Sequence, residues 1–101
     1  MTELQFQVHQ VDPRTFRLVG ELDMATVQTF TAAIDATQAD GQMTLDLSEL
    51  AFIDSHGLHA LVKYARALDG RGSLVLTNVP SFALKVFEIV GFDKNAGIEL
   101  K

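Results

Sequence analysis

The chain contains no cysteine. A disulfide framework, a thiolate metal site and a cysteine nucleophile are therefore excluded. Cationic side chains are also scarce, because eight lysines and arginines stand against thirteen aspartates and glutamates, for a formal net charge of −5. The basic residues are scattered along the chain, so the sequence lacks the positive patch that binds nucleic-acid phosphates. We expect no nucleic-acid partner.

Long apolar runs are missing as well, and no stretch approaches membrane-spanning length. The first ten residues, MTELQFQVHQ, lack the basic and apolar regions of a signal peptide. These features predict a cytoplasmic protein without direct membrane insertion. Hydrophobic residues make up 48% of the chain and charged residues 21%, a balance typical of globular proteins. A length of 101 residues suits one domain spanning residues 1–101.

The most informative stretch is residues 43–68, MTLDLSELAFIDSHGLHALVKYARAL. Alternating apolar residues at its start predict a strand, which a short loop joins to an amphipathic helix. Asp54 and Ser55 stand at the helix start and are both favourable N-cap residues. Free N–H groups and partial positive charge favour an anion there, so an exposed hydroxyl at this point suits a phosphate switch. Spacing alone favours the simpler interpretation of a strand, a loop and an ordinary capped helix.

The rest of the chain continues this alternation of strands and helices. Asp12-Pro13 separates two short strand patterns and predicts an N-terminal hairpin. Asp23 is expected to cap the first helix, and Pro80 with Ser81 to start the last one. The predicted strands cover residues 3–9, 16–18, 43–47, 73–77 and 98–100, and the predicted helices cover residues 23–40, 54–68 and 80–91.

This order predicts an α/β fold. Strand–helix–strand units give right-handed crossovers between parallel neighbours, and the hairpin adds an antiparallel edge. Thr44 and Asp46 interrupt the apolar pattern of their strand, so one face of the sheet should be partly solvated. Asp46 itself is expected to face solvent or to pair with a neighbouring cation. We therefore expect a small mixed β-sheet with an N-terminal antiparallel hairpin and helices mainly on one face.

Three segments resemble the STAS domain family (sulfate transporter and anti-sigma factor antagonist), in particular the small bacterial anti-sigma factor antagonists. They are LVGELDMAT at residues 18–26, LDLSELAFIDSHGLHALV at 45–62 and VFEIVGF at 86–92. The resemblance implies the family's STAS fold and a protein-interaction regulatory function. An unmodified antagonist binds an anti-sigma factor that is itself a serine kinase of the GHKL type, and so frees a sigma factor. Phosphorylation at the start of the middle helix reverses that binding through a local change of charge.

The family's phospho-acceptor is usually the Ser or Thr immediately before the helix glycine, and here that position is His56. Ser55 matches the neighbouring serine, which the family usually leaves unmodified. Ser55 is thus the substitute acceptor, although a capping role is favoured for it, and His56 is expected to face solvent. The residues assigned to partner binding are Asp23, Asp54, Ser55, His56, Gly57, Leu58 and Leu84.

Leu84 is included because the last predicted helix is apolar on nearly every side. Ala83, Val86, Phe87 and Val90 form one stripe, and the other apolar residues, among them Leu84, lie outside it. A domain of this size cannot easily bury a helix all round, so we expect a partner surface or weak self-association there.

Other interpretations change the partner or the class of function. Some stand-alone STAS domains resemble subunits of ABC-type lipid transporters, where an ATPase subunit is the partner and no serine phosphorylation is needed. A catalytic triad of Asp54, Ser55 and His56 is disfavoured because adjacent residues on one helix do not converge, so we expect no enzyme. His56 and His59 can share a helical face, but a metal site needs further ligands, and we predict no metal or other cofactor.

Overall fold

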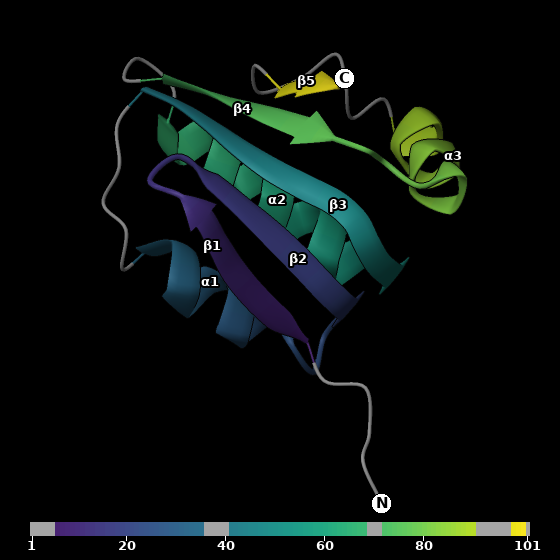
Figure 1. The fold of residues 1–101 in the computed structure, drawn as a ribbon. Coiled ribbons are helices and arrows are strands. Elements are labelled where there is room, and N and C mark those ends of the chain that lie inside the picture. The colour runs from purple at the N-terminus through teal and green to yellow at the C-terminus, as the bar shows by residue number, and fades with distance from the viewer. Residues whose placement is uncertain (1–5, 36–40, 69–71, 91–97, 101) are drawn as a thin grey trace, which may run out of the picture.

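The computed structural model describes residues 6–35, 41–68, 72–90 and 98–100. Within these residues, five strands form one sheet in the order β1-β2-β3-β4-β5, and three helices connect the later strands (Figure 1). The elements are β1 (Gln7–Asp12), β2 (Thr15–Leu22), α1 (Val27–Asp35), β3 (Gly41–Ile53), α2 (Ser55–Leu68), β4 (Gly72–Thr77), α3 (Ser81–Val90) and β5 (Ile98–Leu100). None of the described helices is long and apolar enough to span a membrane.

The predicted fold class is confirmed. β1 and β2 form the antiparallel hairpin, in which Val8 pairs with Leu18 and Gln10 with Phe16. All later neighbours, from β2 to β5, are parallel. Because each crossover moves one strand further in the same direction, right-handed connections place the helices on one face of the sheet. The predicted short last strand is present as β5, whereas the predicted helix end at Gly91 lies outside the described residues.

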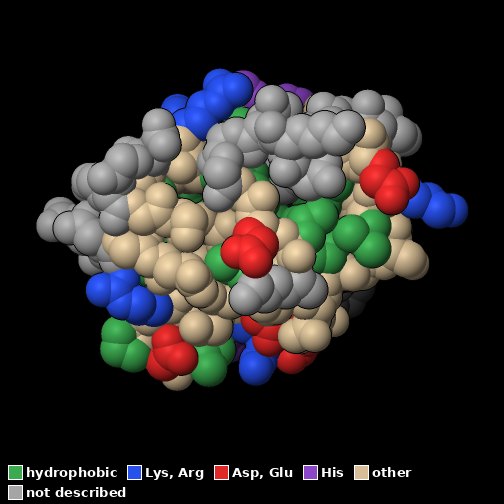
Figure 2. Space-filling view, turned by 90° about the horizontal axis from the view of Figure 1, so that it is seen from above, with side chains coloured by type: hydrophobic (Ala, Val, Ile, Leu, Met, Phe, Trp, Pro, Cys, Tyr) green, Lys and Arg blue, Asp and Glu red, His purple; other side chains and the backbone are tan. Residues whose placement is uncertain are grey.

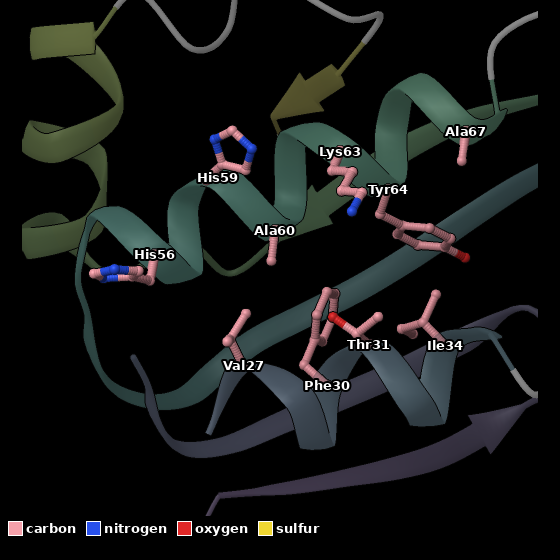
Figure 3. Close-up of a pocket in the computed structure, with 10 residues that line it drawn as sticks. All are labelled: Val27, Phe30, Thr31, Ile34, His56, His59, Ala60, Lys63, Tyr64 and Ala67. Atoms are coloured by element: carbon pink, nitrogen blue, oxygen red, sulfur yellow. The ribbon is translucent and has the colours of Figure 1, made fainter. Parts of the chain in front are cut away.

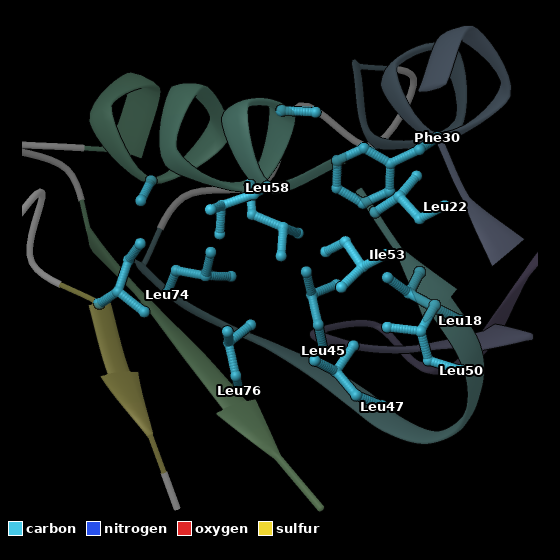
Figure 4. Close-up of a cluster of buried hydrophobic side chains, with 14 of the residues drawn as sticks. Leu18, Leu22, Phe30, Leu45, Leu47, Leu50, Ile53, Leu58, Leu74 and Leu76 are labelled. Carbon is cyan, nitrogen blue, oxygen red and sulfur yellow. The ribbon is translucent and has the colours of Figure 1, made fainter. Parts of the chain in front are cut away.

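The hydrophobic core fills the space between this face and the helices. Leu45 and Leu47 on β3 alternate with exposed or half-exposed residues, and Leu18 on β2 lies beside them (Figure 4). Leu58 and Leu61 from α2 and Ala83 and Phe87 from α3 join the same cluster. Burial of apolar surface of this kind is the main stabilising contribution to a small domain.

β3 is longer than predicted. We expected a strand over residues 43–47 and then a loop, but the strand continues to Ile53, where it pairs with Leu22. The register between β2 and β3 shifts twice, and at each shift β3 contains one residue more than β2. Such bulges interrupt the two-residue alternation, which is why the second half of the strand carries no strand pattern in the sequence.

The other face of the sheet carries a polar cluster around Asp46. Its carboxylate accepts from Arg17 Nε at 3.2 Å, from Asn78 Nδ2 at 3.1 Å and from the backbone N–H of Ser48 at 2.9 Å. Burial alone would raise the pKa of Asp46, but these hydrogen bonds outweigh it and lower the pKa below its ordinary value. Of the two roles expected for Asp46, pairing with a cation is the one observed.

Candidate functional site: the start of helix α2

The carboxyl ends of β2 and β3 bring two turns together. Leu22 and Ile53 are paired residues at the ends of these parallel strands, and the N–H of Asp54 donates to the carbonyl of Leu22 at 3.2 Å. The turn after β2 therefore lies against the start of α2. Residues 23–24 and 54–56 come together there, although about thirty residues separate them in sequence. Carboxyl ends of parallel strands are where α/β proteins commonly build their sites.

Asp54 caps α2. Its Oδ1 accepts from the backbone N–H groups of His56 at 2.9 Å and Gly57 at 3.0 Å, and its Oδ2 accepts from the N–H of Met24 at 3.3 Å. Burial alone would raise the pKa of Asp54, but these three backbone donors and the nearby His56 lower it below the ordinary value. The capping role favoured for Ser55 is thus wrong: Ser55 is the first residue of the helix and is exposed.

Asp23 and Thr26 form a reciprocal cap before α1. Asp23 Oδ1 accepts from the N–H groups of Ala25 at 3.0 Å and Thr26 at 3.2 Å, while Thr26 Oγ1 accepts from the N–H of Asp23 at 3.0 Å. The Thr26 hydroxyl also donates to the carbonyl of Glu21 at 2.6 Å. The predicted cap therefore acts on the turn at residues 24–26, and α1 itself begins only at Val27. This closed network fixes the turn that carries Met24.

Two of the residues assigned to partner binding are buried. Leu58 belongs to the hydrophobic core, and Gly57 packs directly on the strand ends. A β-carbon at residue 57 would clash with the Leu22 carbonyl oxygen and lie 2.9 Å from Ile53 Cγ1. Gly57 is therefore a packing requirement that lets α2 approach the sheet closely, and neither residue offers a side chain to a partner.

The exposed part of this site is small and mixed in character. The side chain of His56 is 54% exposed, and its Nδ1 lies 3.7 Å from Asp54 Oδ2. The side chain of Met24 is 68% exposed, which is unusual for a large apolar residue. The sequence offered no signal for this exposed residue, because an isolated methionine in a turn fits no pattern. We call the exposed Met24, Ser55 and His56, with the two capping aspartates Asp23 and Asp54, the helix-start surface.

Leu84, the remaining assigned residue, is 37% exposed on α3, as is Phe82. Hydrophobic side chains gather on the right of the molecule in Figure 2, the side on which α3 lies in Figure 1.

In the described part of the chain, no three His, Asp or Glu side chains come together as metal ligands. His56 and His59 both line a groove between α1 and α2.

Comparison with known proteins identifies the family of this chain. The sequence matches the family described as "Mlab, STAS domain" over residues 6–100. No curated protein matches it significantly.

Three solved structures, each 24% identical to this chain, share the fold. An anti-sigma factor antagonist from Mycobacterium paratuberculosis covers 96% of this chain and 86% of its own, with a TM-score of 0.78. For the anti-sigma factor antagonist SpoIIAA in its unphosphorylated form, the match covers 96% of this chain and 87% of the SpoIIAA chain, with a TM-score of 0.64. For the Bacillus cell fate determinant SpoIIAA in its phosphorylated form, the match covers 96% of this chain and 91% of the SpoIIAA chain, with a TM-score of 0.66. The chain belongs to the STAS domain family and has the fold of anti-sigma factor antagonists.

Proposed function

We propose that this domain is a regulatory protein-binding module that docks a kinase-type anti-sigma factor through the helix-start surface, and so frees a sigma factor. The observation that carries the proposal is the exposed start of α2, capped by Asp54, in a fold shared with anti-sigma factor antagonists. Because Asp54 already fixes both the helix and the Met24 turn, little conformational entropy is lost when a partner binds. Met24 supplies an apolar anchor beside polar neighbours, an arrangement typical of binding surfaces.

His56 gives this module a different mode of regulation. It stands where the family's phospho-acceptor is expected and has no hydroxyl group. Ser55 is exposed, but Asp54 already accepts from the N–H groups of His56 and Gly57, the donors that a phosphate at this helix end would use. The pKa of Asp54 is lowered, because its hydrogen bonds outweigh the effect of burial, so this carboxylate stays ionised. A phosphate on Ser55 would therefore lie beside a negative charge. We propose that partner binding here is not controlled by serine phosphorylation.

The same observation favours a second candidate partner, the ATPase subunit of an ABC-type lipid transporter. A STAS subunit of such a system would dock without a phosphorylation cycle, so the loss of the acceptor at His56 would carry no penalty. The docking surface is the same in both cases. The two candidates therefore differ in the partner and in whether a kinase acts on this chain.

Affinity capture from the native lysate, followed by mass spectrometry of partners and modifications, separates the candidates. A GHKL-type kinase, recovered with this chain unphosphorylated, supports the first proposal. An ABC ATPase subunit supports the second. Capture should be repeated with Met24→Glu as the test variant and Val11→Glu as its control, because Val11 is an exposed apolar residue (51%) on β1, away from α2. A partner retained equally by both variants would contradict docking through the helix-start surface.

A further inference from the structure

A groove of about 400 Å³ lies between α1 and α2, and its volume falls within the range of small-molecule sites (Figure 3). The floor is apolar and buried, and is formed by Phe30 and Ile34 from α1 and Ala60 from α2. The mouth is exposed and polar, with Thr31 on one helix and Lys63 on the other. His56, His59, Val27, Tyr64 and Ala67 complete the lining.

The charge of this groove is opposite to that of the whole protein. The chain carries a formal net charge of −5, yet α2 contains no aspartate or glutamate and does contain Lys63 and Arg66. The ammonium group of Lys63 points toward α1 across the groove, whereas His59 points away from α1 (Figure 3). Lys63 forms no ion pair with any residue that the structure describes. An anionic group at the mouth would therefore meet a cation that no described residue neutralises.

Tyr64 adds a buried hydroxyl group to the wall. Its ring packs edge-on against Phe30, with centroids 6.3 Å apart, and its hydroxyl oxygen is buried without a hydrogen-bond partner among the described residues. Burial raises the pKa of the Tyr64 phenol, so the group stays a hydroxyl that can donate. Tyr64 thus makes its part of the wall slightly polar without adding a charge.

We propose that this groove binds an unbranched aliphatic carboxylate, with its hydrocarbon chain on Phe30, Ile34 and Ala60 and its carboxylate at Lys63. The buried floor matches an alkyl chain, while Lys63 and the Thr31 hydroxyl group at the mouth match a carboxylate. A sugar or nucleotide would place polar groups on a floor that has no donors for them. A cationic amphiphile would be repelled by Lys63. The proposal is independent of the partner, because the groove shares only His56 with the helix-start surface.

The test is isothermal titration calorimetry of the full chain with octanoate and decanoate below their micelle-forming concentrations. Octanol and octylamine serve as probes with the same tail and a different head. We expect binding of both carboxylates, with affinity rising by up to about four-fold for each methylene that is buried. Octanol should bind at least about ten-fold more weakly than octanoate, and octylamine should not bind. Equal affinity for octanol and octanoate, or no heat with decanoate at millimolar concentration, would overturn the proposal.

Matched variants locate the site. Lys63→Gln should weaken decanoate binding about ten-fold, while Arg66→Gln, an exposed cation of the same helix outside the groove, should leave it unchanged. Thermal unfolding of both variants checks that they remain folded. Amide chemical shifts should move on α1 and α2 when decanoate is added. Shifts confined to β1 or α3, equal losses in the two variants, or tighter binding of an acidic helical peptide than of decanoate would each contradict a carboxylate site here.

Discussion

The carboxylate of Asp54 accepts a hydrogen bond from the backbone N–H of Met24, 3.3 Å away and thirty residues earlier in the chain. The same carboxylate caps α2 through its other oxygen. One side chain thus holds both the helix start and the turn that presents Met24. If this arrangement forms the docking surface, Asp54 should affect stability and binding together.

Replacing Asp54 with alanine should destabilise the domain by about 1 kcal/mol, the usual cost of losing an N-cap. For a domain of this size, that loss lowers the Tm by roughly 4–8 °C. Asp54→Asn should cost less than the alanine variant, because asparagine still caps the helix, but its amide nitrogen cannot accept from the N–H of Met24. Thermal unfolding followed by circular dichroism measures both variants. An alanine variant as stable as the parent would show that the cap contributes little.

Acid should remove part of the stability that Asp54 provides. The pKa of Asp54 is lowered in the folded state, so its contribution is fully present above the unfolded value of about 3.9 and is lost as the pH falls through the folded value. Urea unfolding measures the free energy of unfolding at about pH 7 and about pH 3. Between these two pH values, Asp54→Asn should lose less of this free energy than the parent. The pKa of Asp46 is lowered as well, but Asp46 is present in both proteins, so its contribution cancels from the comparison. Equal losses in the two proteins would contradict the lowered pKa.

Gly57→Ala should destabilise the domain even though alanine favours helices. The new methyl group would meet the backbone of Leu22 and the side chain of Ile53, and backbone atoms cannot move aside cheaply. Overpacking of this kind costs about 1–3 kcal/mol, which outweighs the gain of up to about 1 kcal/mol from helix propensity. Ser55→Ala, at an exposed position of the same turn, is the control and should change the free energy of unfolding by less than about 0.5 kcal/mol. A Gly57→Ala variant of parental stability would refute the close approach.

His56→Ser should create a phospho-acceptor. The substitution restores a hydroxyl immediately before Gly57, where the family usually carries its acceptor. If the partner is a GHKL-type kinase, incubation with that kinase and ATP should phosphorylate the variant and leave the parent unmodified, as mass spectrometry would show. Ser55→Ala made in the variant should not prevent the modification. Phosphate on Ser55 of the parent would instead mean a switch shifted by one residue.

Leu84→Glu separates a surface role from a core role. Leu84 is exposed, so its substitution should change the free energy of unfolding by less than about 0.5 kcal/mol. Phe87→Ala, on the buried side of the same helix, should cost about 3–5 kcal/mol. Sedimentation velocity of the Leu84 variant also tests the predicted weak self-association. A large loss of stability in Leu84→Glu would place this residue in the core.

The elements that obey a regular period were predictable, and those that depend on contacts between distant residues were not. Alternation on β2 and helical spacing on α2 follow directly from burial of one face, and the fold class follows from their order. The second half of β3 was missed because its two bulges remove the alternation, and only pairing with β2 reveals them. Bulges leave no distinct composition in a single sequence.

The start of α2 was predicted in position but not in detail. A helix start at Asp54 and Ser55 was evident from the residue types, yet only the geometry shows that Asp54 is the cap. Met24 gave no sequence signal because its position depends on the capping network of its turn and on a hydrogen bond to the distant Asp54. The groove was missed for a different reason: Phe30 and Ile34 have ordinary core spacing, and their exposure to a cavity depends on how α1 and α2 pack.

Docking through the helix-start surface is tested most directly by calorimetry of the purified partner with three forms of this domain: the parent, Met24→Glu and Val11→Glu. We predict that Met24→Glu weakens binding at least about ten-fold, because the charge replaces an apolar anchor beside the start of α2. Val11→Glu should bind within about two-fold of the parent, since it adds the same charge elsewhere. Equal affinities for all three forms would contradict the account.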